Sequence, residues 1–515
     1  MRVSELEAAQ QQITELKEQL AETQRQLDLL VRHVFGKRSE RTPAAAHPAQ
    51  MDLELAAENA ALESAPPAQP RKPKGGSRKG RQTRAALLPE HLPAEETVLI
   101  PLAVQAAPEC WRRIGQEVVE RLERIPGRLV RQRLVRPTFV SVEQPYAAPV
   151  TAPAPPQVID GSFFGPQLLA DMVLGKYLYH QPLYRQARGI EWESGVKLSA
   201  ATMCQTIARL ADAVAPVVDC LSTALWKNGY AQMDLTPVRC LAREREGGSF
   251  MGQMWVTATV GGDVIYTWDE SKEAIVAERI VPEWFCGILQ TDGGSELGCF
   301  LRGGKGRTRP PPKIIRTGCW AHVRRKFFEG AKAGCPLCAR LLKIINALYH
   351  LEHIVREAGF TPQERRALRQ RRAARLIRGL RRRMDKVIAR ERPRSPAAKA
   401  CLYTIGQWEG LLVYLEHGHV EIDNNSVENA IRPCALGKKN WLFIGDMGAG
   451  QRSATFYSLL GSCLRRDVNP RNYLHWLLEN LPHATNQTVH TLTPAAFAAR
   501  KAVETPAAPS AATAA

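Results

Sequence analysis

The sequence contains no apolar run of the roughly 18 residues that a membrane-spanning helix requires. Its N-terminus is charged and amphipathic, so we expect neither a signal peptide nor a membrane partner. The 12 cysteines are scattered over 515 residues, which argues against a secreted disulfide framework. These absences together predict a cytoplasmic protein.

Acidic residues are also scarce relative to basic ones. The chain has 70 Lys and Arg against 51 Asp and Glu, for a formal net charge of +19. Such a balance favours a polyanionic partner, and without a membrane segment nucleic acid is preferred. A chain of this length exceeds a single hydrophobic core, so we expect several domains.

Residues 1–40 carry a heptad pattern, with apolar residues at Leu6, Ile13, Leu20, Leu27 and Val34. Polar residues fill nearly all of the remaining positions. The pattern therefore predicts a coiled coil and a homo-oligomer, and not a helix that packs on the protein's own core. Residues 41–92 are rich in Ala, Pro and basic residues. They predict a disordered linker that contacts phosphates or serves only as a spacer.

Two small units are expected next. Residues 93–160 predict short strands. The pattern of residues 161–225 predicts three helices with a turn at Gly195 before the third. Such a trio is compatible with a helix-turn-helix that binds DNA, but the signal is weak because helix trios are common packing units.

In residues 226–332 the spacing of the apolar residues changes to the pattern typical of β-strands. A strand is expected to end at Asp234, a hairpin to cross Gly261 and Gly262, and a helix over 272–280 to lead into a strand ending at Asp292. A last strand follows near 313–317. Three antiparallel strands, a helix, a strand, a connection and a strand form the layout of a ribonuclease H-like sheet within a multidomain α+β protein.

Residues 333–415 predict a helical insertion. One helix has an apolar stripe, and its other faces are expected to carry Arg365, Arg366, Arg369, Arg371, Arg372, Arg375, Arg378, Arg381, Arg382 and Arg383. Such a surface is either solvated or in contact with phosphate, and the charge balance makes us prefer phosphate. Residues 416–485 should complete the core, and 486–515 should be a disordered tail.

Glu428 follows a run of acid and amide residues, in the first turn of a helix expected to begin near Asn425. On the local sequence alone, a capping box formed with Asn425 explains the position of Glu428. Convergence with Asp234 and Asp292 offers another explanation, because Mg²⁺ or Mn²⁺ would neutralise three carboxylates. Two such ions roughly 3.5–4 Å apart stabilise the attacking and leaving oxygens of phosphoryl transfer.

Four segments, residues 234–237, 289–293, 319–327 and 423–443, resemble the transposases of the insertion sequence sixty-six family in the same order. The resemblance implies a bacterial, nucleoid-associated DDE transposase whose metal ligands are Asp234, Asp292 and Glu428. Water would attack at the element's terminal repeats, and the freed 3′-hydroxyl would attack target DNA. Accessory proteins of the same element are further expected partners.

The resemblance also includes a Cys-x-x-His motif from Cys319 to His322. His322 would orient the scissile strand, or be an ordinary core histidine. Further candidate DNA contacts, with surface charge and core packing as their alternative, are Arg324, Arg325, Lys326, Arg432, Lys438, Lys439 and Trp441.

Two positions depart from the family pattern. Its members carry a four-cysteine zinc module before the catalytic domain, but residues 93–160 hold only Cys110, so we expect a degenerate module without zinc. Cys335 and Cys338 are interpreted as helix-terminal thiols. Leu235 replaces an acid of the family, which keeps open a catalytically inactive, transposase-derived DNA-binding protein. A metal-dependent nuclease is a further rival.

Overall fold

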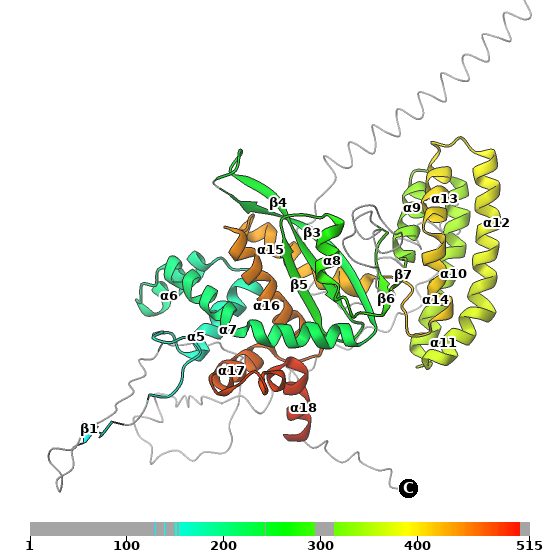
Figure 1. The fold of residues 1–515 in the computed structure, drawn as a ribbon. Coiled ribbons are helices and arrows are strands. Elements are labelled where there is room, and N and C mark those ends of the chain that lie inside the picture. Colours follow the sequence, from blue (N-terminus) through cyan, green and yellow to red (C-terminus); the bar gives the residue numbers. More distant parts are fainter. Residues whose placement is uncertain are drawn as a thin grey trace, which may run out of the picture. The chain divides into compact units, whose positions relative to one another are not determined.

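The computed structural model describes residues 129, 138–139, 150–151, 154–242, 244–293 and 314–504, all within one compact unit, Ile125–Ala515 (Figure 1). The predicted coiled coil, the basic linker and Cys110 lie outside the described residues. Of the predicted zinc-module region, the structure describes one small antiparallel pair, β1 (Thr138–Phe139) and β2 (Val150–Thr151), with residue 129 and the last residues before 160.

The centre of the unit is a five-stranded mixed sheet in the order β5-β4-β3-β6-β7. Its antiparallel part consists of β3 (Tyr230–Leu241), β4 (Ser249–Ala258) and β5 (Val264–Asp269). The helix α8 (Ala274–Ile280) then leads to β6 (Gly287–Gln290) and β7 (Ile314–Thr317), which extend the sheet in parallel from the other edge of β3. The predicted order of strands and helix is confirmed.

The strand β3 is longer than predicted. It continues beyond Asp234 because β4 remains its antiparallel partner as far as Leu241, which pairs with Ser249. On its other edge, pairing with the parallel strand β6 ends at Gln232 opposite Gln290. Asp234 therefore lies within a strand, just past the end of the neighbouring parallel strand, and the prediction that it ends β3 is wrong.

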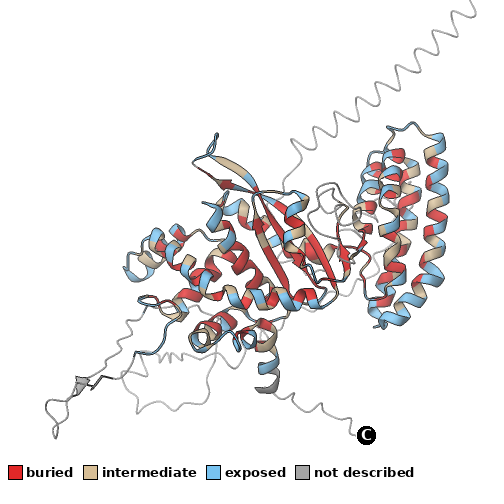
Figure 2. Cartoon of the chain, in the orientation of Figure 1, coloured by how far each residue is buried: buried red, intermediate tan, exposed pale blue. Residues whose placement is uncertain are grey.

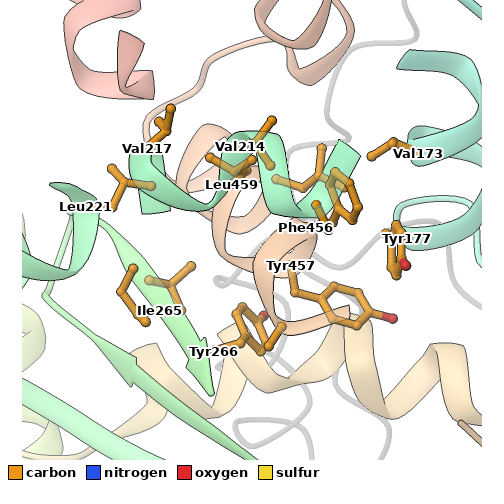
Figure 3. Packing of buried hydrophobic residues seen from close by; sticks show 14 of the residues in the cluster. Val173, Tyr177, Val214, Val217, Leu221, Ile265, Tyr266, Phe456, Tyr457 and Leu459 are labelled. Carbon is orange, nitrogen blue, oxygen red and sulfur yellow. The ribbon is translucent and has the colours of Figure 1, made fainter. Parts of the chain in front are cut away.

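Two helices cover the sheet and form its main core. These are α7 (Ala200–Lys227) and α16 (Met447–Arg465), and Figure 3 shows their apolar side chains meeting those of β5 at Ile265 and Tyr266. Ser458 and Ser462 of α16 hydrogen-bond the backbone of β5 at Tyr266 and Val264. The helix thereby satisfies backbone groups at this sheet edge, as edge strands require.

The predicted trio of helices is present as α5 (Pro166–Tyr177), α6 (Leu183–Ser194) and α7. Gly195 ends α6 with φ +72°, a left-handed conformation that glycine adopts without steric cost. The third helix is the longest of the three, and its apolar face, which packs on the sheet, continues to Leu225 and Trp226.

Residues 333–415, the predicted insertion, are helical. Together with the preceding helix and with Tyr230 and Ile288 of the sheet, they build a second core cluster. The elements of this region are α9 (Trp320–Lys332), α10 (Pro336–Glu357), α11 (Pro362–Leu368), a π-helical turn η3 (Arg369–Ala373), α12 (Ala374–Arg390), α13 (Pro396–Gly406) and α14 (Trp408–Glu416). Cys335 is the N-cap of α10 and Cys338 is buried in its first turn, so both are helix-terminal thiols as predicted.

Arg369 corrects the prediction of a continuous arginine surface. Its side chain is 1% exposed and pairs with Glu352 at 2.7 Å. Arg365 is also largely buried, and it lies 3.2 Å from Glu352 and 3.0 Å from Glu421. These two arginines therefore stabilise the insertion.

The C-terminal part contains α15 (Asn425–Trp441), α16, α17 (Pro470–Asn480), the short helical turns η4 (Leu481–His483) and η5 (Val489–Leu492), and α18 (Pro494–Glu504). Residues 486–515 are expected from the sequence to be a disordered tail. That prediction is wrong for residues 486–504, which contain η5 and α18. Phe497 of α18 is buried against the ring of Tyr473, which anchors this Ala-rich segment. No helix in the described ranges has both the length and the apolar character to cross a membrane.

Candidate functional site

Two buried glutamines join the strands that carry Asp234 and Asp292. Gln232 and Gln290 are opposite each other in the parallel register of β3 and β6, and each precedes an aspartate by two residues. The side-chain amide of Gln232 donates to Oε1 of Gln290 at 2.9 Å. This bond fixes the two aspartate-bearing chain segments side by side.

The same glutamines bind the segment that leads into α15. Nε2 of Gln232 donates to the carbonyl of Asp423 at 3.0 Å, and its Oε1 accepts from the amide of Val427 at 3.2 Å. Nε2 of Gln290 donates to the carbonyl of Glu421 at 3.0 Å. The first turn of α15, which contains Glu428, is thus tied to β3, and the segment before it is tied to both strands.

Asp234 is half-buried, and its Oδ1 accepts from the amide of Leu235 at 2.7 Å. Burial, opposed by that amide, and the charges of Asp292 and Glu428 together raise the pKa of Asp234 to about 7. Because like charges disfavour ionisation, each of the other two carboxylates acts electrostatically on Asp234.

Glu428 does not cap the helix. The N-cap is Asn424, its side chain makes no capping hydrogen bond, and the helix begins at Asn425 as predicted. The capping-box interpretation is therefore wrong. Instead Oε1 of Glu428 is buried 3.7 Å from Nδ1 of His322, and neither atom has a hydrogen-bond partner in the described part of the chain.

The three predicted ligands are of the chemical type that a divalent metal ion binds. Asp234, Asp292 and Glu428 offer carboxylate oxygens, which Mg²⁺ and Mn²⁺ prefer, and the buried Oε1 of Glu428 lacks a hydrogen-bond donor among the described residues. Within residues 154–242, 244–293 and 314–504, however, no three acid, His or Cys side chains stand close enough together to hold a metal ion. The carboxylates would have to move toward one another to share one.

Cys319 of the predicted Cys-x-x-His motif is the N-cap residue of α9. Burial raises the pKa of its thiol well above the usual range, and the charge of Asp423 adds to this effect. The thiol therefore stays protonated at neutral pH. Of the two motif residues, only His322 lies beside a predicted ligand, Glu428.

Sequence reasoning missed the residues that hold the site together. Gln232, Gln290 and Tyr230 are buried polar side chains, and the hydroxyl of Tyr230 donates to Gln290 and accepts from the amide of Glu421. Asn424 is also fully buried, and neither polar atom of its side chain is hydrogen-bonded among the described residues. Polar residues within apolar strands, two positions before each aspartate, are the signal that could have identified the glutamines.

The predicted DNA contacts on α9 differ in exposure. Arg324 is 8% exposed and donates to Oδ1 of Asn346 on α10, so it serves the insertion's packing. Arg325 and Lys326 are exposed. The ammonium of Lys326 lies 5.9 Å from the ring of Tyr403, whose hydroxyl donates to the carbonyl of Asp292. These two basic residues therefore lie on the side of α9 near the second aspartate.

The predicted contacts on α15 also differ. Lys438 donates to the hydroxyl of Thr236 and the carbonyl of Pro237, which ties the end of α15 to β3 just past Asp234. Trp441 is half-buried and packs against the main core. Arg432 and Lys439 are exposed to solvent.

Comparison with known proteins places the chain in a family. The model of the Transposase IS66 family matches residues 161–452, which include Asp234, Asp292 and Glu428, and a model described as Transposase C of IS166 homeodomain matches residues 15–97.

Three similar proteins come from Sinorhizobium fredii (strain NBRC 101917 / NGR234), and all three carry the name uncharacterized protein. The protein y4jD is 29% identical over 92% of this chain and 93% of its own length, and y4hP is 27% identical over 87% and 83%. The protein y4qI is 30% identical over 72% of this chain and 68% of its own length. Since the family model covers more than half of the sequence, the chain belongs to the IS66 family of transposases.

Proposed function

We propose that the protein is an active DNA transposase that cuts the ends of its element and joins them to target DNA, with Asp234, Asp292 and Glu428 as the metal ligands. The observation that carries this proposal is the pair of buried glutamines, Gln232 and Gln290, which hydrogen-bond the two aspartate-bearing strands to each other and to the segment that leads to Glu428. The pKa of Asp234 is raised by burial and by both other carboxylates, although they come from three separate segments of the chain. A fold gains nothing in stability by gathering like charges, so a cationic partner accounts for the arrangement.

The sheet supports a ribonuclease H-like assignment of the core. The strand order β5-β4-β3-β6-β7, with three antiparallel strands followed by two parallel ones, is the layout expected for that fold. Asp234 follows the last residue of β3 that pairs with β6, and Asp292 follows the end of β6 itself. Both aspartates therefore stand just past the carboxyl end of the parallel pairing between β3 and β6.

Transposases of this class ordinarily use divalent ions, which would supply charge neutralisation and an activated oxygen nucleophile. The chain's own residues have separate tasks. The two glutamines fix the backbone of all three acid-bearing segments. His322 would orient the scissile strand beside Glu428, and the exposed Arg325 and Lys326 would bind phosphates near Asp292.

The proposal is tested with duplex DNA that carries the element's ends. The wild-type protein should nick and join this DNA when Mg²⁺ or Mn²⁺ is supplied, and Asp292→Ala should bind the DNA without cutting it. Asp219→Asn changes an exposed acid on α7 and should behave as wild type. If the wild-type protein binds but never cuts, even with accessory proteins of the element, it is instead a transposase-derived DNA-binding protein.

A further inference from the structure

The helix α12, with the turn η3 before it, presents a row of basic side chains on the face opposite its buried face. Ile377, Leu380 and Met384 point into the core of the insertion. The opposite face is exposed and carries what we call the basic stripe, which consists of Arg371, Arg375, Arg378, Arg382 and Lys386. Figure 2 shows the exposed colour running along α12. Spacings of three or four residues place the stripe along one side of a helix.

The charges of the stripe are not neutralised within the described residues. In the part of the chain that the structure describes, no carboxylate forms an ion pair with any of its five members. Asp385 lies next to the stripe, but Arg381 holds it at 2.9 Å. The guanidinium of Arg378 donates to the carbonyl of Ala374 in its own helix. A row of uncompensated like charges is unfavourable for the free protein and invites an anionic partner.

The stripe contrasts with the arginines of the preceding segment. Arg369 is buried, Arg365 is largely buried, and both are bound to Glu352, so they stabilise the fold. Members of the stripe are exposed and pair with no acid among the described residues, so they contribute little to packing. Stability of the fold therefore does not explain five cations on one face.

We propose that the basic stripe of α12 binds the sugar-phosphate backbone of duplex DNA, which makes the insertion a second DNA-contacting surface besides the acid site. From Arg375 to Lys386 the helix rises about 17 Å. Over that length duplex DNA carries about ten phosphates, half on each strand. Arginine's planar fork is suited to phosphate oxygens, and the contact would not depend on base sequence.

A membrane surface is a poorer partner for this helix. Helices that bind lipid insert an apolar face between the headgroups, but the apolar face of α12 is buried against α10 and α13. The choice of DNA as the polyanionic partner rests on the proposed function.

The test measures binding of the full-length protein to a labelled duplex of mixed sequence, at several salt concentrations and with EDTA to prevent cleavage. The stripe variant combines Arg375→Gln, Arg378→Gln, Arg382→Gln and Lys386→Gln. The control variant removes the same charge from exposed lysines on four different helices: Lys227→Gln, Lys332→Gln, Lys343→Gln and Lys501→Gln. Thermal unfolding of both variants checks the fold, and the pair Arg375→Gln with Arg382→Gln replaces the stripe variant if it unfolds early.

We expect the slope of log K against log salt to become shallower by about 0.9 for each phosphate that the stripe no longer neutralises. Affinity at fixed salt should fall at least about tenfold, and both changes should occur only in the stripe variant. Equal slopes and affinities for stripe and control variants would overturn the inference. Weaker binding of the stripe variant to anionic vesicles, with unchanged binding to DNA, would overturn it as well.

Cleavage is measured separately, with Mg²⁺ and duplex that carries the element's ends. A wild-type protein that binds through the stripe but never cuts refutes only the proposed catalysis. A wild-type protein that cuts, with a stripe variant that binds DNA normally, refutes only the stripe.

Discussion

Gln232 and Gln290 hydrogen-bond each other across two parallel strands, and each stands two residues before an acid of the proposed site. Gln232 also binds the backbone on both sides of the start of α15. One buried side chain therefore relates the positions of Asp234, Asp292 and Glu428. In this protein the geometry of the acids depends on amide groups that have no direct part in the chemistry.

Replacing Gln232 with leucine should lower the free energy of unfolding by about 2–5 kcal/mol. The change leaves the carbonyl of Asp423, the amide of Val427 and Oε1 of Gln290 without this partner, and each unsatisfied buried group costs about 1–3 kcal/mol. Chemical unfolding measures the decrease. Gln253→Leu on β4 is the matched control, because that side chain is also buried and has no comparable network among the described residues. Equal decreases for the two variants would show that Gln232 has no special role.

The metal-free protein should become less stable as the pH rises from about 4 to about 7. The pKa of Asp234 is raised to about 7 in the folded chain, whereas an unfolded aspartate titrates near 4. Between these values the folded state binds more protons than the unfolded state, so the free energy of unfolding falls as the pH rises. Asp234→Asn removes this dependence.

In EDTA, Asp234→Asn should gain roughly 2–4 kcal/mol over the wild type between pH 4 and pH 8. Guanidinium unfolding of both proteins across this range measures the difference. A difference that stays constant with pH would mean that the carboxyl of Asp234 titrates normally in the folded protein. Adding Mn²⁺ should reverse the effect, because a cation stabilises the ionised carboxylates of the folded state only.

Several elements follow directly from the sequence, and others depend on distant contacts. The start of α15 and the order of strands and helix are predictable, because their apolar periods are local properties of the chain. The extension of β3 beyond Asp234 is not, because it depends on pairing with β4 through a separate segment. Local sequence likewise favours a capping box at Glu428, although its side chain lies beside His322.

Two of the wrong predictions have the same cause, because both are based on the types of residue present and not on their contacts. Arginine is rarely buried, which favours a surface position for Arg369, but Glu352 and two backbone carbonyls bind its guanidinium in the interior. The Ala- and Pro-rich composition near the C-terminus leads to the expectation of a disordered tail, but residues 494–504 form a helix whose Phe497 packs on Tyr473. In both places specific tertiary contacts outweigh the composition.

Arg369→Leu should destabilise the protein by about 3–5 kcal/mol, because it leaves Glu352 buried without its closest cation. Arg366→Leu is the control. It breaks an ion pair with Glu416 in which both side chains are more than half exposed, and it should cost at most about 1 kcal/mol. Thermal and chemical unfolding compare the two variants. Similar effects would contradict the assignment of Arg369 as a structural residue.

The most direct test of the three-acid site is the affinity of the protein for Mn²⁺, measured by calorimetry on the wild type, Asp234→Asn, Asp292→Asn, Glu428→Gln and the control Asp219→Asn. If the carboxylates share their ions, each of the first three variants should bind at least one Mn²⁺ at least about tenfold more weakly, while the control binds as the wild type does. Unchanged Mn²⁺ affinity in all three variants would contradict the account.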